Sequence, residues 1–256
     1  MRKRRGQVVD GWLLLDKSID VSSNYALQEV KRLMDAQKAG HTGTLDPFAT
    51  GLLICCFGRA TKIAGHLLDA DKSYTATLLF GQETDSGDLT GTVVDQADSS
   101  FAAVNEQQLL DVLPQFKGLI SQVPPMTSAL KHQGRPLYAY AREGITIERP
   151  PREITVYDLE LLSCAGKTAV VRVSCSKGTY IRTLAQDIGR AIGVGAHLTA
   201  LRRDSVGPFA LEQAHTIEQL KVLENPLQAV RPLSDLPESL AQVFVNKGTA
   251  VASLQS

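Results

Sequence analysis

Residues 40–57 have the sequence GHTGTLDPFATGLLICCF, in which a polar stretch is followed directly by an apolar one. The polar part, residues 41–51, is rich in Gly, Thr and turn-forming residues and is therefore expected to be a loop. The apolar part, residues 52–57, is a short uninterrupted run, which is typical of a buried strand. We therefore expect a polar loop that leads into a buried strand.

The rest of the chain mixes strand and helix patterns. Residues 72–80, KSYTATLLF, alternate between apolar and polar positions, as a half-buried strand does. Because strands and helices interleave without a regular β-α-β order, the expected fold is α+β, with a mixed, largely antiparallel sheet flanked by helices and loops. Further strands are expected at residues 11–17, 154–162, 168–174 and 198–202, and helices at residues 22–34, 61–68, 105–116, 137–143, 179–192 and 217–223.

Length and composition indicate a globular protein. The chain has 256 residues, of which 43% are hydrophobic and 21% charged, so one large domain with at most a small appendage is expected. The apolar runs at residues 12–15 and 52–57 are too short for a signal peptide or a membrane span, and we therefore expect a cytoplasmic protein. The four cysteines lack the spacing of a zinc site, so we expect no metal.

Charge is unevenly distributed along the chain, although the totals of 27 basic and 27 acidic residues balance. The basic stretch at residues 165–203 predicts an electropositive face for phosphates, although an ordinary solvated surface can have the same pattern. Between Lys72 and Lys117 there is no basic residue, but there are seven acidic ones: Glu83, Asp85, Asp88, Asp95, Asp98, Glu106 and Asp111. From residue 165 to 203, a single acid, Asp187, is outnumbered by seven basic residues: Lys167, Arg172, Lys177, Arg182, Arg190, Arg202 and Arg203.

Asp46 is the first candidate for chemistry. It lies in the polar loop, among hydroxyl groups and glycines that permit a ligand to approach the backbone closely. It also precedes Pro47, and an Asp-Pro pair commonly opens a turn, so a purely structural role remains open. His41, at the start of the loop, is a second candidate, although an isolated histidine is more often structural.

Arg182 and Tyr74 are further candidates. Arg182 falls outside the apolar stripe of its expected helix, near the N-terminal turn, where an arginine can hold a carboxylate ionised through two hydrogen bonds. A surface arginine that binds phosphate is the alternative. Tyr74 lies on the alternating strand and is either a core residue or a ring that holds a base removed from its stack. No glycine motif for phosphates follows a strand, so a nucleotide cofactor is not expected.

Four segments stand in order along the chain and carry a family resemblance. They closely resemble the bacterial tRNA pseudouridine-55 synthase family over about residues 11–232, which implies the pseudouridine synthase fold. The resemblance also implies an enzyme that isomerises the T-loop uridine of tRNA by flipping the base. We expect a monomer that binds the T-arm stem-loop of tRNA and uses no cofactor. The segments are GHTGTLDPFATGLL (residues 40–53), KSYTATLLFGQETDSGDLTG (72–91), VPPMTSALKHQGRPLYAYAREG (123–144) and CSKGTYIRTLAQDIGRAIGVGAHLTALRR (175–203).

The resemblance also implies roles for particular residues. Asp46 would be the catalytic carboxylate, Arg182 its salt-bridge partner, and Tyr74 the ring that stacks on the flipped uracil. The other implied substrate contacts are Tyr180 and Leu201 lining the base pocket, His41 inserting into the RNA loop, Lys17 near the active site, and Lys131 within a clamp at about residues 122–152. The catalytic domain is expected to span residues 1–235, and residues 236–256 to be a remnant where the family begins a small C-terminal RNA-binding domain.

Some points depart from the family pattern or stay open. The family commonly has Lys-Pro and then a glycine after its first strand, whereas Ser18 and Asp20 stand here. Asp46 could stabilise or attack C1′ of the sugar, or it could remove a proton from C2′, and the sequence is compatible with both routes. A guide-RNA-dependent pseudouridine synthase and an RNA-binding or tRNA-folding factor are the alternative functions.

Overall fold

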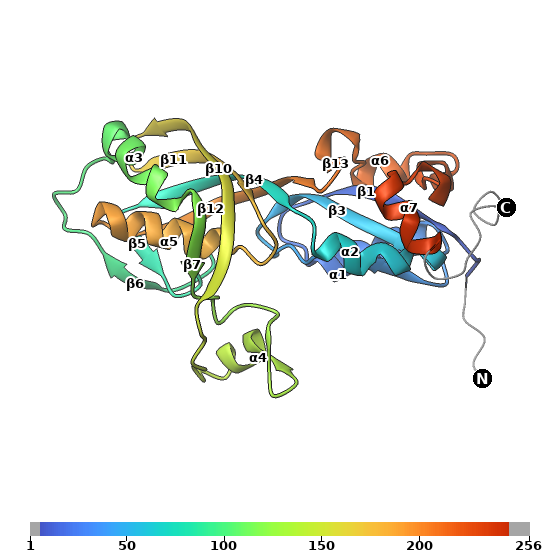
Figure 1. Cartoon of the computed structure of the whole chain (residues 1–256), viewed down its shortest axis with the longest axis horizontal. Coiled ribbons are helices and arrows are strands. Elements are labelled where there is room, and N and C mark those ends of the chain that lie inside the picture. The colour runs from blue at the N-terminus through green and yellow to red at the C-terminus, as the bar shows by residue number, and fades with distance from the viewer. Residues whose placement is uncertain (1–5, 246–256) are drawn as a thin grey trace. The chain divides into compact units, whose positions relative to one another are not determined.

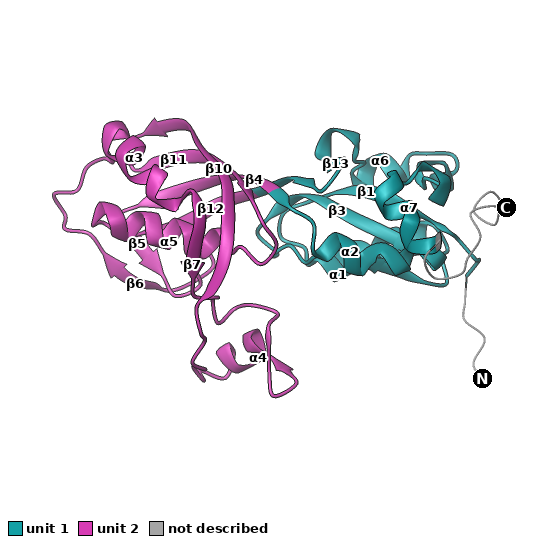
Figure 2. Cartoon of the chain, viewed as in Figure 1, with its two compact units in different colours: residues 1–72, 202–256 teal, residues 73–201 magenta. Residues whose placement is uncertain are grey.

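The computed structural model describes residues 6–245 and divides into two compact units (Figure 2). Unit 1 is formed by the chain up to Lys72 and from Arg202 onwards, and unit 2 by Ser73–Leu201. The chain therefore leaves unit 1 once, builds unit 2 and returns. None of the helices within residues 6–245 combines the length and the apolar character that crossing a lipid bilayer requires.

Unit 1 is organised around β3 (Thr50–Phe57), the strand that the apolar run predicted. β1 (Gly11–Lys17) is antiparallel to β3 over its whole length. β2 (Ala39–His41) is also antiparallel to β3, whereas the C-terminal part of β12 (Ala196–Val206) is parallel to it. β13 (Phe209–Ala210) pairs with β12.

Two hydrophobic clusters enclose β3, one on each face. The odd-numbered residues from 53 to 57 pack in a cluster with α1 (Ser23–Leu33) and α6 (Ile217–Lys221). The even-numbered residues from 52 to 56 pack in another cluster with α2 (Ala64–Leu68) and α7 (Glu238–Val245). A strand that is buried on both faces exposes neither face to solvent, which explains the uninterrupted apolar run in the sequence.

In unit 2 the strands follow the order β12, β4 (Lys72–Phe80), β11 (Thr168–Cys175), β10 (Arg152–Ala165) and β7 (Gly118–Gln122). β10 is antiparallel to both β11 and β7. Along β4, buried residues alternate with half-buried ones, as the sequence pattern predicted.

Two helices and a small hairpin complete the body of unit 2. α5 (Ile181–Ile192) ends at Gly193, whose φ of 88° is a left-handed conformation that glycine adopts freely. α3 (Glu106–Val112) begins after Asn105, whose side chain accepts hydrogen bonds from the first helical amides. The antiparallel hairpin consists of β5 (Gln82–Thr84) and β6 (Val93–Gln96).

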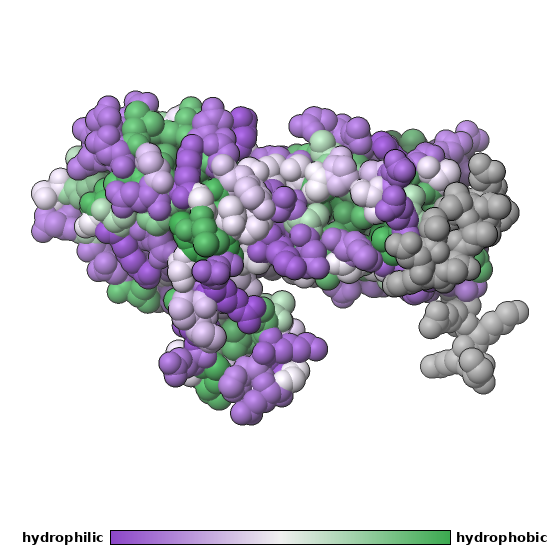
Figure 3. Space-filling model, viewed as in Figure 1, coloured by the Kyte–Doolittle hydropathy of each residue, from purple (hydrophilic) through white to green (hydrophobic). Residues whose placement is uncertain are grey.

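A separate segment extends away from the strands of unit 2 (Figure 1). It contains the two short strands β8 (Lys131–His132) and β9 (Arg135–Pro136), followed by α4 (Leu137–Ala141). The helix expected at residues 137–143 is thus present as the shorter α4. On the face seen in Figure 3, hydrophilic and hydrophobic residues are interspersed over this segment.

The α+β fold class and the mixed, largely antiparallel sheet are confirmed. Each expected helix is shorter than predicted, and two of them are shortened because the chain forms tighter 3-10 turns at residues 58–63 and 113–116. β2, β7, β8, β9, β13 and α7 were not predicted. The 3-10 helices are η1 (Gly58–Ile63), η2 (Leu113–Phe116), η3 (Leu211–Gln213), η4 (Pro226–Ala229) and η5 (Leu233–Asp235).

Candidate active site

Asp46 lies in unit 1, in the loop between β2 and β3, and is half-buried. Its neighbours Leu45 and Phe48 are each only 3% exposed, so apolar contacts anchor the loop on both sides of the carboxylate. The amide of Ala49 donates to the carbonyl of Asp46 at 3.1 Å. Asp46 therefore opens a turn, as the structural interpretation of Asp-Pro expected. This hydrogen bond is made by the backbone of Asp46, so the turn is compatible with a chemical role of the side chain.

Lys17 is the last residue of β1 and is fully buried. Its ammonium group donates hydrogen bonds to the carbonyls of Val21 at 2.7 Å, Ser18 at 2.9 Å and Pro47 at 3.2 Å. Burial lowers the pKa of Lys17 to about 8, because desolvation disfavours its charged form, and the nearby Asp46 carboxylate opposes this shift. Lys17 is thus linked both to the backbone that follows Asp46 and to the charge of its carboxylate.

The turn after Lys17 has a backbone conformation that usually requires glycine, but a non-glycine residue adopts it here. Asp20 has a φ of 63°, in the left-handed region that glycine adopts most easily. Its amide donates to the carbonyl of Pro47 at 2.8 Å. The departure from the family pattern at this position therefore changes the side chain while the turn still contacts the Asp46 loop.

Arg203 is a second buried cation beside the loop and is 1% exposed. Its Nε donates to the carbonyl of Leu52 at 2.7 Å and a terminal guanidinium nitrogen donates to that of Gly43 at 3.2 Å, so one side chain joins the two ends of the loop. Its backbone lies opposite Gly51, whose φ is 101°. A Cβ on Gly51 would lie 2.4 Å from the carbonyl oxygen of Arg203, so this close approach of β3 and β12 requires glycine.

His41 ends β2 and is half-buried at the start of the same loop. Burial lowers the pKa of His41, and the positive charge of Arg203 lowers it further, while a hydrogen bond with the backbone of Gly43 acts in the opposite direction. The lowered pKa favours the neutral form of the imidazole. Within residues 6–245 its Nδ1 is buried without a hydrogen-bond partner.

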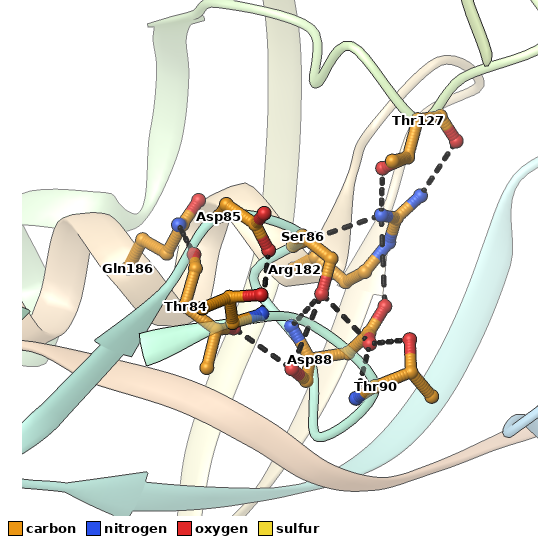
Figure 4. Close-up of polar contacts among 9 residues, drawn as sticks. Thr84, Asp85, Ser86, Asp88, Thr90, Thr127, Arg182 and Gln186 are labelled. Atoms are coloured by element: carbon orange, nitrogen blue, oxygen red, sulfur yellow. Dashed lines mark hydrogen bonds and ion pairs between the residues drawn. The ribbon is translucent and has the colours of Figure 1, made fainter. Parts of the chain in front are cut away.

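Arg182 lies in unit 2, in the first turn of α5, and is only 4% exposed (Figure 4). One guanidinium nitrogen donates to the carbonyl of Ser86 at 2.8 Å and to the hydroxyl of Thr127. The other terminal nitrogen donates to the carbonyl of Thr127 at 3.1 Å. Arg182 also forms an ion pair with Asp88, with 3.6 Å between the nearest nitrogen and oxygen. It is therefore an interior residue, and the alternative of a surface arginine is wrong.

Asp88 is equally buried and is held by its own turn. Its Oδ1 accepts hydrogen bonds from the hydroxyl of Ser86 at 2.9 Å, from the amide of Thr90 at 2.9 Å and from the hydroxyl of Thr90 at 2.5 Å. The sequence reasoning did not single out Asp88, Ser86 or Thr127. All three lie inside the segments that carry the family resemblance, and this position is the sequence signal that could have identified them.

The remaining candidates of unit 2 occupy different environments. Tyr74 is 8% exposed and belongs to the buried set of β4. The amide of Tyr180 donates to the side chain of Gln122 at 2.8 Å, and that side chain donates back to the carbonyl of Tyr180 at 3.1 Å. Leu201 is 7% exposed in β12, and Lys131 is exposed in β8.

Asp46, His41 and Lys17 belong to unit 1, whereas Arg182 belongs to unit 2, so the pairing of Asp46 with Arg182 stays a prediction.

The segment that carries Lys131 has a small core of its own. The guanidinium of Arg135 lies 4.7 Å from the ring centroid of Tyr140 and forms an ion pair with Glu143. The ring of His132 meets the same tyrosine edge-on, with 5.9 Å between centroids. Leu137 of α4 is 3% exposed. These contacts give the exposed segment a defined conformation.

The basic stretch does not form the uniform electropositive face that its charge count predicted. Arg182 and Arg203 are buried. Lys167 and Lys177 are exposed. The other three cations are in ion pairs: Arg172 with Glu160, Arg190 with Glu83 and Asp187, and Arg202 with Asp16. Within residues 6–245, no three His, Cys, Asp or Glu side chains are grouped so that they could hold a metal ion.

Comparison with known proteins gives concordant matches. Residues 31–181 match the N-terminal domain of TruB family pseudouridylate synthases, and residues 182–233 match the tRNA pseudouridylate synthase B C-terminal domain. The curated tRNA pseudouridine synthase B of Bordetella pertussis is 61% identical over 94% of this chain and 98% of its own. That of Chromohalobacter salexigens is 56% identical over 91% of this chain and 75% of its own.

A solved structure has the same fold. A chain in the crystal structure of a Cbf5-Nop10-Gar1 complex is 31% identical and superimposes with a TM-score of 0.67. The match covers 87% of this chain and 60% of that one, so the present chain spans less than two thirds of the solved chain.

Proposed function

The chain belongs to the TruB family of pseudouridylate synthases, and from this membership we propose that it isomerises the T-loop uridine of tRNA to pseudouridine. The observation that carries the proposal is the similarity to tRNA pseudouridine synthase B of B. pertussis, which extends over nearly the whole of both chains. The reaction breaks the bond between C1′ of the sugar and N1 of uracil and forms a bond from C1′ to C5. A proton leaves C5 and one is gained at N1, so atoms and electrons balance without a cofactor.

Asp46 is the proposed catalytic carboxylate. An ionised carboxylate next to the ribose stabilises positive charge that develops at C1′, or attacks that carbon to form a covalent intermediate. Removal of a proton from C2′ is the other route. The rigid attachment of the Asp46 loop through Lys17 and Arg203 supports this assignment, because a charged catalytic group must be held in place before the substrate arrives.

Arg182 is the proposed partner that orients the Asp46 carboxylate. Its guanidinium is buried and is oriented by hydrogen bonds to Ser86 and Thr127. A guanidinium whose orientation is fixed in this way can form two hydrogen bonds with one defined carboxylate. We propose that Tyr74 stacks on the flipped uracil and that Tyr180 and Leu201 line the pocket. Such a pocket must exclude water and retain the detached base until it is attached again.

Binding of the RNA must offset a few kcal/mol for flipping the nucleotide. We propose that His41, whose lowered pKa favours the neutral ring, inserts into the RNA loop, and that Lys17 supports the active site from within. Lys131 and residues 122–152 are proposed to clamp the T-arm, since this segment is exposed, preformed and rich in cations.

We further propose a cytoplasmic monomer with a catalytic domain at residues 1–235. Residues 236–256 are proposed to correspond to the start of the family's C-terminal RNA-binding domain, and 246–256 of these lie outside the described residues. A guide-RNA-dependent synthase is not favoured, because the higher identities are to bacterial proteins that are named tRNA pseudouridine synthase B. A role restricted to RNA binding or tRNA folding is not favoured either, because the chain retains the carboxylate and the buried arginine.

The proposal is tested with tRNA that carries tritium at C5 of its uridines. Wild type is expected to release tritium from the T-loop uridine, whereas Asp46→Asn is expected to release none while its Kd for tRNA stays within about threefold, since only a charge at the reacting centre is lost. Asp98→Asn, which changes an exposed carboxylate of unit 2, is the matched control and should behave as wild type. Wild-type turnover by Asp46→Asn would remove Asp46 from the mechanism.

A second measurement separates the alternatives. An isolated T-arm stem-loop, supplied without any guide RNA, is expected to be a substrate. Failure on this stem-loop together with activity in the presence of a guide would favour the guide-dependent class. Faster tRNA folding by Asp46→Asn would reveal an additional role that does not need catalysis.

A further inference from the structure

Ser23 contacts the backbone immediately before the proposed catalytic carboxylate. It is the first residue of α1 and is 1% exposed. Its hydroxyl donates a hydrogen bond to the carbonyl of Leu45 at 3.0 Å and accepts one from the amide of Leu45 at 2.8 Å. One side chain thus satisfies both polar groups of a buried residue whose peptide bond continues directly to Asp46.

The backbone immediately after Asp46 is fixed as well. The carbonyl of Pro47 accepts hydrogen bonds from the ammonium of Lys17 at 3.2 Å and from the amide of Asp20 at 2.8 Å. Arg203 joins the two ends of the loop but contacts neither Leu45 nor Pro47 in these bonds. Of these anchors, Ser23 is therefore the one that acts on the residue before Asp46.

We propose that Ser23 is a positioning residue that sets the backbone register of Asp46 for catalysis. The inference rests on the proposed function of Asp46. Without the hydroxyl, the buried amide and carbonyl of Leu45 have lost the partner that satisfies them. We therefore expect the backbone at Leu45 to rotate toward other donors and acceptors. A shift of about 1 Å in a catalytic group can reduce turnover by about a hundredfold, because the reacting atoms leave their attack geometry.

The neighbouring Ser22 provides a matched control. It is the N-cap of the same helix, and its side chain accepts a hydrogen bond from the amide of Tyr25 at 3.1 Å at the exposed surface. Ser22→Ala removes one hydroxyl, as Ser23→Ala does. It weakens the N-terminus of α1 but leaves the hydrogen bonds of Leu45 in place. Comparison of the two variants separates loop positioning from helix stability.

The experiment measures three quantities: the single-turnover rate on tritiated tRNA, the Kd for tRNA, and hydrogen exchange at the amide of Leu45. For Ser23→Ala we expect a rate at least about tenfold lower, a Kd within about twofold of wild type, and faster exchange at Leu45. Ser22→Ala should keep the rate within about twofold and the exchange at Leu45 unchanged. Ser23→Thr, which retains the hydroxyl, should recover most of the lost rate.

A rate for Ser23→Ala within about twofold of wild type would overturn the inference, and so would an equal loss of rate in Ser22→Ala. Unchanged exchange at Leu45 in Ser23→Ala would overturn it too, even if the rate fell. A wild-type protein that releases no tritium would instead contradict the proposed function, and exchange at Leu45 would still show whether Ser23 fixes the loop.

Discussion

The most unusual residue beside the proposed active site is Lys17, a lysine that the fold buries completely. Its pKa of about 8 in the folded protein lies below the ordinary value of 10.5, mainly because burial disfavours the ammonium form. Between these two values the unfolded chain holds a proton on Lys17 that the folded chain has released. Stability must therefore rise with pH through this window, because the unfolded state binds more protons there.

This gives a prediction for Lys17→Met. The free energy of unfolding of wild type, relative to that of the variant, is expected to increase between pH 8 and pH 10.5 by up to about 3 kcal/mol, since one pKa unit corresponds to about 1.4 kcal/mol. Urea titrations at pH 7, 8, 9 and 10 measure this difference directly. Parallel pH curves for the two proteins would mean that folding does not lower the pKa of Lys17.

At the scale of single residues, sequence reasoning identified those whose chemistry is conspicuous and missed those whose partners come from far along the chain. Asp46 stood out because it lies among glycines and hydroxyl groups. Ser23 was not singled out, although its hydroxyl contacts a residue 22 positions away. Arg203 looked like one cation of a basic stretch, yet it is buried against the carbonyls of β3 and the loop. Such roles depend on tertiary packing, which no local pattern encodes.

At the scale of elements, the turn between β5 and β6 binds and orients the side chain of Arg182. Asp88 faces the guanidinium, and the hydroxyl and amide groups of the same turn satisfy the other oxygen of Asp88 (Figure 4). The adjacent Asp85 has a different task, because its side chain accepts a hydrogen bond from the amide of Thr92 at 2.9 Å and braces the turn at the surface.

These two carboxylates make a paired prediction. Asp88→Asn removes the negative charge next to Arg182. We expect turnover to fall by about tenfold or more, because the guanidinium loses its carboxylate partner and keeps only its hydrogen bonds to Ser86 and Thr127. Asp85→Asn should leave turnover within about twofold of wild type, since it does not contact Arg182. Thermal melting of both variants checks that a lower rate of Asp88→Asn does not reflect unfolding. Equal rates for the two variants would show that Asp88 is dispensable for catalysis.

Elements were predictable where one periodic pattern dominated. β1 and β4 have the predicted bounds, because an apolar run and a strict alternation leave little choice. β2 was missed because three half-buried residues carry no period. The helix expected at residues 105–116 becomes a 3-10 turn from Leu113, and Pro114 lies in its first turn, where a missing amide costs least. Short elements and helix ends depend on pairing and capping rather than on periodicity.

For the molecule as a whole, the acidic and basic stretches partly neutralise each other. Glu83 pairs with Arg190, and Asp88 pairs with Arg182, so each ion pair joins residues about a hundred positions apart in the sequence. A count of charges along the chain predicted a phosphate-binding face, but the fold uses several of these cations for its own carboxylates. Affinity for RNA must then come mainly from cations outside such pairs, for example the exposed Lys131.

The salt dependence of tRNA binding tests this distribution of charge. Each phosphate contact that a variant loses should make the plot of log Kd against log salt concentration shallower by roughly 0.7 to 0.9, because fewer counterions are released. Lys131→Ala is expected to show this change. Arg190→Gln is expected to leave the slope unaltered, because two carboxylates, those of Glu83 and Asp187, already neutralise that guanidinium. If Arg190→Gln flattened the plot as much as Lys131→Ala, the paired arginines would have to be counted among the phosphate contacts, and the basic stretch would be an RNA-binding face after all.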